Sequence, residues 1–273
     1  MSSRQSFSLG KGLSGAVAAV PAAWSGAWLS LVLLLAAVAA WPLVGLHFGT
    51  PAALGWGLVL VLLKLVALGG LYRTFIFGRA AAAEGRGPGG LQFGATEVRL
   101  LFASLVIALF VAMILAAGFF VLAIAFDFSG LASGYNSSLA AWHAAVMRHR
   151  TVTDWAFIVL PHLLALLLIF VAMKFVLAPV ATVAGKRMVT LNALGLSSGN
   201  VGKLFIGVVL LALPFIVAFA AVMHLPAPTR MSHMNTCLWV WIATAVLSVG
   251  VLLPLQTGFL ASAYRQIVDL RAK

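Results

Sequence analysis

Six long apolar stretches constrain the fold of this chain more than any other feature. They cover residues 27–47, 52–73, 98–126, 155–177, 201–223 and 237–263. A helix needs about 20 consecutive apolar residues to cross the hydrocarbon core of a bilayer. Only 8% of the 273 residues are charged, whereas soluble domains carry roughly a quarter. The sequence therefore predicts an all-α polytopic membrane bundle with six transmembrane helices, in which residues 1–273 form a single transmembrane domain.

The positions of Lys and Arg predict how the chain is threaded. If both termini face the cytoplasm, 13 of the 17 basic residues lie at inner ends of spans, three lie outside, and Lys64 lies within the membrane. The three outer ones are Arg148, Arg150 and Arg230. Cytoplasmic ends of spans collect Lys and Arg, so we predict an N-in, C-in topology. The Ala, Leu, Val and Gly-rich composition suggests a bacterial inner membrane.

This topology also explains the net charge of +12. A soluble protein with that charge would suggest nucleic-acid binding, but no basic-aromatic surface or nucleic-acid module is recognisable. We therefore expect no nucleic-acid partner.

Two segments have the periodicity of helices that lie along a membrane surface. Residues 6–22 place Phe7, Leu13, Val17 and Val20 near helical spacing. Residues 178–196 separate an apolar stripe from a second face that carries Thr182, Lys186 and Thr190. We predict interfacial helices at both places. Between the second and third spans, the Gly-rich residues 79–96 predict a flexible connector, after which Glu97 enters the first turn of a helix.

Lys64 is the most unusual residue within a span, because an intramembrane charge is costly and points to a functional site by default. Gln256 precedes Arg265 by nine residues, as Lys64 precedes Arg73. Pro254 also frees a backbone carbonyl in that turn. We predict that the second and sixth spans pack together and that Lys64 meets Gln256 or a freed carbonyl. A structural or snorkelling lysine is the simpler explanation of this residue, and contact with a lipid phosphate or a substrate is the alternative. His162 is a third intramembrane polar residue, and it more simply suits helix packing than proton transfer.

A ring of basic residues is expected at the cytoplasmic face, where each would attract anionic lipid headgroups by about 1 kcal/mol. Plain topology signalling is the simpler explanation for the same residues. The ring comprises Arg73, Arg79, Lys174, Lys186, Arg187, Lys203 and Arg265.

Catalysis and metal binding receive little support from the sequence. Cys237 is the only cysteine, and the five carboxylates all fall at or beyond the predicted membrane edges. A zinc site needs three or four converging ligands, and the histidines do not form such a motif. We expect no catalytic residues, no metal and no cofactor.

Several short segments resemble a family of bacterial membrane proteins. Leu177-Ala178-Pro179, Lys186-Arg187 and Ser198-Gly199-Asn200, followed by Lys203-Leu204-Phe205, look like the membrane domain of glycerophosphoryl diester phosphodiesterases. The resemblance implies a six-span membrane module. The hydrolase domain of some relatives has no counterpart in this sequence, so it does not imply phosphodiesterase activity.

Three functions remain open from the sequence. The first is a non-enzymatic membrane module that binds anionic phospholipid or docks as an accessory subunit to a larger membrane protein complex. The second is a small permease with a path near Lys64 and Gln256. The third is a membrane-embedded lipid-modifying enzyme, against which the lack of buried carboxylates argues.

Overall fold

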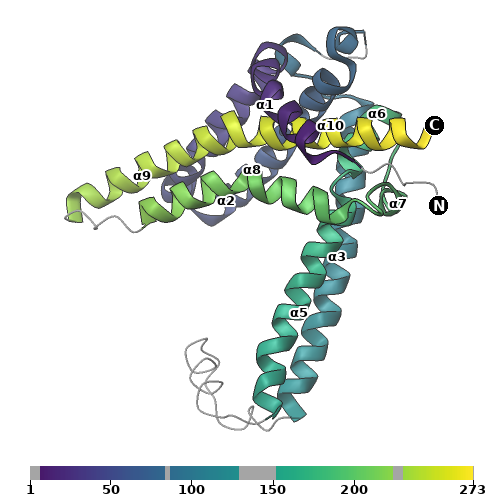
Figure 1. Ribbon diagram of the computed structural model, residues 1–273. Helices are drawn as coiled ribbons and strands as arrows, with labels where there is room; N and C mark the ends of the chain where they lie inside the picture. Colours follow the sequence, from purple (N-terminus) through teal and green to yellow (C-terminus); the bar gives the residue numbers. More distant parts are fainter. Residues whose placement is uncertain (1–6, 84–86, 129–151, 224–229, 273) are drawn as a thin grey trace.

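The computed structural model describes residues 7–83, 87–128, 152–223 and 230–272. Six of its helices are long and apolar enough to cross a membrane, which confirms the predicted all-α, six-span architecture (Figure 1). Arg148 and Arg150, two of the three basic residues predicted to lie outside, fall beyond the described residues. The helices are α1 (Leu9–Gly26), α2 (Trp28–Phe77), α3 (Ala95–Phe128), α5 (Val152–Phe175), α6 (Ala178–Gly185), α7 (Ala193–Leu196), α8 (Val201–Met223), α9 (Arg230–Leu247) and α10 (Leu253–Ala272).

The first two spans both belong to α2, which folds back on itself at Gly49. This glycine has φ 76° and ψ −177°, a conformation that residues with a Cβ rarely adopt. Across the bend, the indole Nε1 of Trp56 donates a hydrogen bond of 2.9 Å to the carbonyl of Ala37. The bend therefore separates two antiparallel spans, which correspond to the stretches predicted at 27–47 and 52–73.

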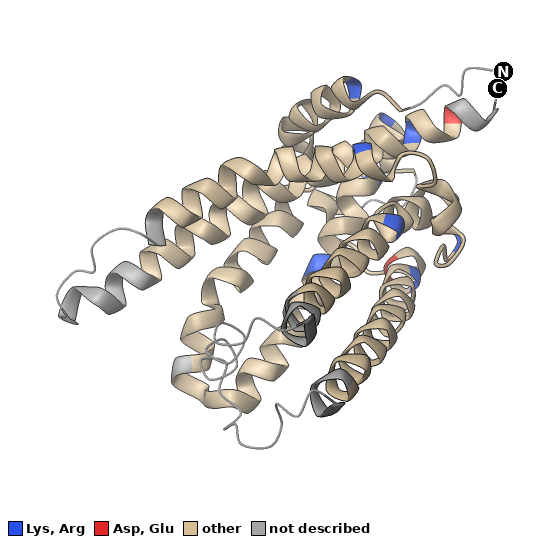
Figure 2. Ribbon diagram, turned by 60° about the horizontal axis from the view of Figure 1, so that its bottom comes forward, with Lys and Arg blue, Asp and Glu red and all other residues tan. Residues whose placement is uncertain are grey.

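Buried side chains gather at one end of the molecule, which we call the packed end. Its largest cluster joins α1, α2, α3, α6, α8 and α10 through Phe7, Tyr72, Leu100, Val180, Leu204 and Phe259, among others. In contrast, at most 28% of the residues in any apolar span window are buried. From the packed end, α3 and α5 run side by side in a direction different from α8 and α9 (Figure 1). Most of the described Lys and Arg residues also lie at the packed end (Figure 2).

Helix α1 lies along α10, and small residues make most of the contact. Its buried residues are small, namely Gly12, Ala16, Ala19, Ala23 and Gly26, whereas Val17 is 65% exposed. Small residues let two helix backbones approach closely. A helix is therefore present where the interfacial helix was expected, and it packs on the last span.

The predicted interfacial helix at 178–196 is corrected, because it is two short helices with a turn between them. Helix α6 ends at Lys186, which has φ 49° in the left-handed region. The buried Thr182 hydroxyl donates to Ala178 O and accepts from the N–H of Val189. This side chain ties the turn back onto α6. Since Val180, Ala181, Thr182 and Val183 are all buried, α6 belongs to the core of the packed end.

Two tryptophans bond carbonyls that prolines leave without a helical partner. Pro254 lacks the N–H that would bond Gly250 O, and Trp24 Nε1 donates to that oxygen at 3.0 Å. Pro42 likewise frees Val38 O, which accepts from Trp241 Nε1 at 2.8 Å. A π-helical turn, η3 (Ser248–Leu252), precedes Pro254. Both indoles thereby join one helix to the proline kink of another.

The described part of the Gly-rich connector is docked rather than loose. The turn η2 (Pro88–Gly90) lies against α2, and Gly90 is buried. A Cβ on Gly70 would lie 2.7 Å from Gly90 O, and one on Gly90 would lie 2.7 Å from Ala27 Cα. These backbone approaches require glycine and fix the loop in front of α3.

Candidate functional site

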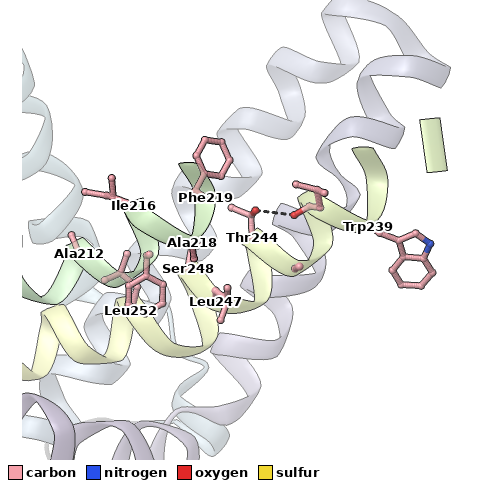
Figure 3. A pocket seen from close by; sticks show the side chains of 12 residues that line it. Ala212, Ile216, Ala218, Phe219, Trp239, Thr244, Leu247, Ser248 and Leu252 are labelled. Carbon is pink, nitrogen blue, oxygen red and sulfur yellow. Dashed lines mark hydrogen bonds between the residues drawn. The ribbon is translucent and has the colours of Figure 1, made fainter. Parts of the chain in front are cut away.

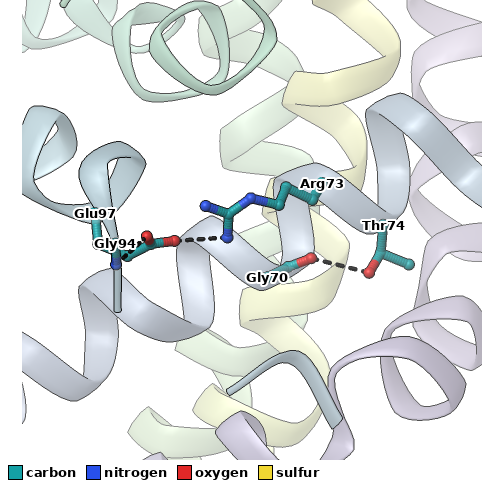
Figure 4. Close-up of polar contacts among 5 residues, drawn as sticks. All are labelled: Gly70, Arg73, Thr74, Gly94 and Glu97. Atoms are coloured by element: carbon teal, nitrogen blue, oxygen red, sulfur yellow. Dashed lines mark hydrogen bonds and ion pairs between the residues drawn. The ribbon is translucent and has the colours of Figure 1, made fainter. Parts of the chain in front are cut away.

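A buried ion pair joins α2 to α3 at the packed end (Figure 4). Arg73 Nη1 lies 2.6 Å from Glu97 Oε1, and the two side chains are 4% and 0% exposed. The N–H of Gly94 donates to Glu97 Oε2 at 2.9 Å. A Cβ on Gly69 would collide with Glu97 Oε1, so the glycine makes room for the carboxylate.

This pair corrects the expected role of Arg73. A guanidinium that is buried and already paired cannot contact a lipid headgroup, so Arg73 leaves the predicted basic ring. Glu97 is the partner that the sequence reasoning missed. The sequence placed it in the first turn of a helix, where the helix dipole favours an anion, and no pattern links it to an arginine 24 positions earlier.

Three other members of the ring also hold the packed end together. Lys203 Nζ donates to Phe7 O at 3.0 Å, and Arg265 donates to the carbonyls of Phe75 and Ile76 at the end of α2. Lys174 Nζ donates to Ser198 Oγ at 3.3 Å and lies over the ring of Phe170. These cations are therefore partly committed to internal contacts.

The remaining three members of the ring, Arg79, Lys186 and Arg187, are exposed. Lys186 and Arg187 lie in the turn after α6, where Met188 and Leu191 are 49% and 52% exposed. Such a combination of cations and apolar side chains suits the headgroup region of an anionic membrane.

A basic hollow of about 430 Å³ lies between α1, the end of α2 and α10. Lys11 and Arg265 line it, together with Thr74, Ser262 and Gln266. Within the described part of the chain, the Lys11 ammonium makes no hydrogen bond or ion pair. Arg265 keeps further N–H donors besides those used on α2. Lys11 was expected only to mark topology, so its place in a hollow is a finding of the structure.

Lys64 and Gln256 line a second hollow, of about 280 Å³, which we call the Lys64 hollow. Its walls come from both halves of α2, from η3 and from α10, through Leu34, Val38, Ser248, Val249, Leu252 and Leu253. The carbonyl freed by Pro254 is bonded by Trp24 and not by Lys64. His162 lies exposed on α5 and is not part of these walls.

An apolar groove of about 530 Å³ lies between α8 and α9 (Figure 3). Its walls include Ala212, Ile216, Phe219, Trp239 and Leu247. Thr244, one of two hydroxyl residues in the wall, donates internally to Val240 O at 2.8 Å. The groove therefore presents hydrocarbon almost throughout.

The described residues do not bring metal-ligating side chains together. Among them, no group of three or more His, Cys, Asp or Glu side chains could hold a metal ion.

Comparisons of the chain with models of protein families, with curated proteins and with solved structures found no match.

Proposed function

We propose that this chain is a non-enzymatic integral membrane module that binds anionic phospholipid at its packed end. The basic hollow carries the proposal, because it gathers Lys11 and Arg265 among hydroxyl and amide side chains at the end of the molecule where most cations lie. A phosphate held there would receive charge-assisted hydrogen bonds from both cations, which are roughly twice as strong as neutral ones.

The turn after α6 supports the same function by a second contact. Met188 and Leu191 can enter the headgroup region while Lys186 and Arg187 attract anionic lipid beside them. Together, the turn and the hollow would favour anionic over zwitterionic lipid at the predicted inner surface of a bacterial membrane.

The test is the lipid that stays bound to the purified protein. The protein would be placed in nanodiscs of equal phosphatidylglycerol and phosphatidylcholine, extracted into mild detergent, and measured by native mass spectrometry. We expect several phosphatidylglycerol molecules to be retained. The variant Lys11→Gln, Lys186→Asn, Arg187→Gln should lose most of this preference. Asn is chosen at position 186 because it tolerates the left-handed backbone.

Arg230→Gln is the matched control, because topology places this cation at the opposite side of the membrane. Unchanged phosphatidylglycerol retention in the triple variant would refute the proposal. A stoichiometric protein that co-purifies, with no preference among lipids, would instead favour an accessory subunit of a larger complex.

A further inference from the structure

Lys64 has a charge that the described part of the chain leaves without a partner. Its side chain is exposed within an apolar span and makes no hydrogen bond or ion pair among the described residues. An intramembrane cation is normally paired or placed in a wet cavity. The chain thus holds an unneutralised ammonium where an anion would be strongly favoured.

The surroundings of Lys64 suit one small anionic group. The Gln256 amide lines the same hollow and offers two further donors. The Ser248 hydroxyl uses its proton on Ala245 O at 3.2 Å. None of the described residues that line the hollow is a carboxylate. A volume of about 280 Å³ holds a phosphate or carboxylate head, while the remaining walls are aliphatic.

The Lys64 hollow adjoins the apolar groove, because Ser248 and Leu252 line both. These two residues are four positions apart, so they lie on one face of the helix. From this shared strip, the groove continues along α9 to Trp239 (Figure 3). The Lys64 hollow continues in the other direction along the chain, to Gln256 near the packed end.

We infer that the Lys64 hollow and the apolar groove form one binding site for a long-chain amphiphile with a single anionic head group. The phosphate or carboxylate binds the Lys64 ammonium and the Gln256 amide. The hydrocarbon chain follows the groove between α8 and α9 toward Trp239. The head then lies at the end of the site nearer the packed end.

This site rests on the lipid-binding function proposed above and adds a defined, one-to-one pocket to it. Surface binding at the packed end involves several exchangeable lipids and depends on Lys11, Lys186 and Arg187. Binding at Lys64 involves one molecule and depends on neither the basic hollow nor the turn after α6. The two can therefore fail separately.

The experiment is a native mass spectrometry titration of delipidated protein in non-ionic detergent. Oleate and palmitoyl-oleoyl-phosphatidylglycerol are the two anionic probes, and palmitoyl-oleoyl-phosphatidylcholine is the probe without net charge. We expect one tight equivalent of an anionic probe, with at least tenfold weaker binding in Lys64→Gln and near wild-type binding in Lys64→Arg. Tighter binding of oleate would assign a carboxylate head, and tighter binding of phosphatidylglycerol would assign a phosphate head.

The chain subsite is tested separately by Ala243→Phe. Ala243 lines the apolar groove, so the larger side chain would fill the groove without changing the charge. It should weaken binding of both anionic probes at least tenfold. Lys11→Gln, in the basic hollow, is the matched charge-removing control and should leave the tight equivalent in place. Unfolding temperatures of all variants without added probe provide the check on folding. Removal of an unpaired intramembrane charge should maintain or raise that temperature.

Equal binding to wild type and Lys64→Gln would overturn the inference. So would a clear fall in the unfolding temperature of ligand-free Lys64→Gln, because it would make the lysine a structural element. Retention of surface phosphatidylglycerol alongside either result would leave the proposed function intact. Conversely, a tight Lys64-dependent equivalent without retained surface lipid would refute the proposed function alone.

Discussion

Arg73 and Glu97 illustrate how single residues are stabilised where water is scarce. Their side chains are almost fully buried, and the carboxylate accepts from both the guanidinium and the N–H of Gly94. Desolvation of two charges is expensive, so a buried pair adds little net stability over apolar residues, whereas loss of one partner is severe. The pair therefore specifies how α2, the Gly94 turn and α3 fit together more than it strengthens the fold.

Glu97→Gln should destabilise the protein by about 3–5 kcal/mol, because it leaves the buried Arg73 charge uncompensated. The measurement is thermal or denaturant unfolding in detergent. Adding Arg73→Met in the same chain should recover a large part of the loss, which a double-mutant cycle would quantify. Asp269→Asn, at an exposed carboxylate, is the control. A small effect of Glu97→Gln, similar to that of the control, would contradict the buried ion pair.

Between helices, close packing of the backbones, rather than the hydrophobic effect, decides which helix faces pair. Lipid tails are as apolar as leucine, so helices in a membrane associate through packing and hydrogen bonds. Here α1 and α10 meet through Ala16, Ala19 and Gly258. Trp24 and Trp241 add hydrogen bonds to kinked partners. Proline in one helix and tryptophan in another thus act as a complementary pair.

Gly258→Ala tests the α1–α10 contact. The new methyl group would collide with the Cβ of Ala19, and overpacking of this kind costs about 1–3 kcal/mol. Unfolding in detergent should show this loss. Gly202→Ala in α8, where a Cβ meets nothing within 4 Å, is the matched control and should be neutral or stabilising because alanine favours helix. Equal behaviour of the two variants would rule out close packing at Gly258.

At the scale of the whole molecule, side chains are buried mainly at the packed end, and the apolar helices that extend from it are largely exposed. The last span candidate extends over 32 residues, Leu238–Asp269, whereas about 20 residues cross the hydrocarbon. The surplus belongs to the packed end, where Ser8 N donates to Gln266 Oε1 and so joins the first and last described segments. With most cations gathered there, the packed end is predicted to face the cytoplasm.

This orientation can be measured with cysteines placed near the two ends of the second span. In a Cys237→Ser background, Arg79→Cys should react with a membrane-impermeant maleimide only after the cells are permeabilised. Thr50→Cys, in the bend between the first two spans, should react in intact spheroplasts. The background protein alone shows any non-specific labelling. The opposite labelling pattern would reverse the predicted threading.

The sequence was sufficient for the six spans, because length and apolarity alone decide whether a helix can cross a bilayer. It also predicted that Lys64 and Gln256 lie at the same depth in the membrane, and the two residues line one hollow. It did not predict the partner of Arg73 or the packing face of α1. The partner of Arg73 depends on a tertiary contact between polar atoms, which leaves no periodic signal. The packing face of α1 does recur at helical spacing, at Gly12, Ala16, Ala19, Ala23 and Gly26, but a search for large apolar residues passes over it. Lys186 has a left-handed backbone that interrupts the helix expected at 178–196. The apolar stripe of that segment does not predict this interruption either.

The antiparallel contact between α1 and α10 also affects how the protein is made. Phe7 packs edge-on against Phe259, with ring centroids 5.8 Å apart, although about 250 residues separate them along the chain. During translation, α1 leaves the ribosome long before its partner exists. Its stripe of small residues must remain uncovered while the intervening spans are inserted. Completion of the packed end therefore waits for the last helix, and a ribosome that stalls before α10 would release a chain whose first helix lacks its main partner.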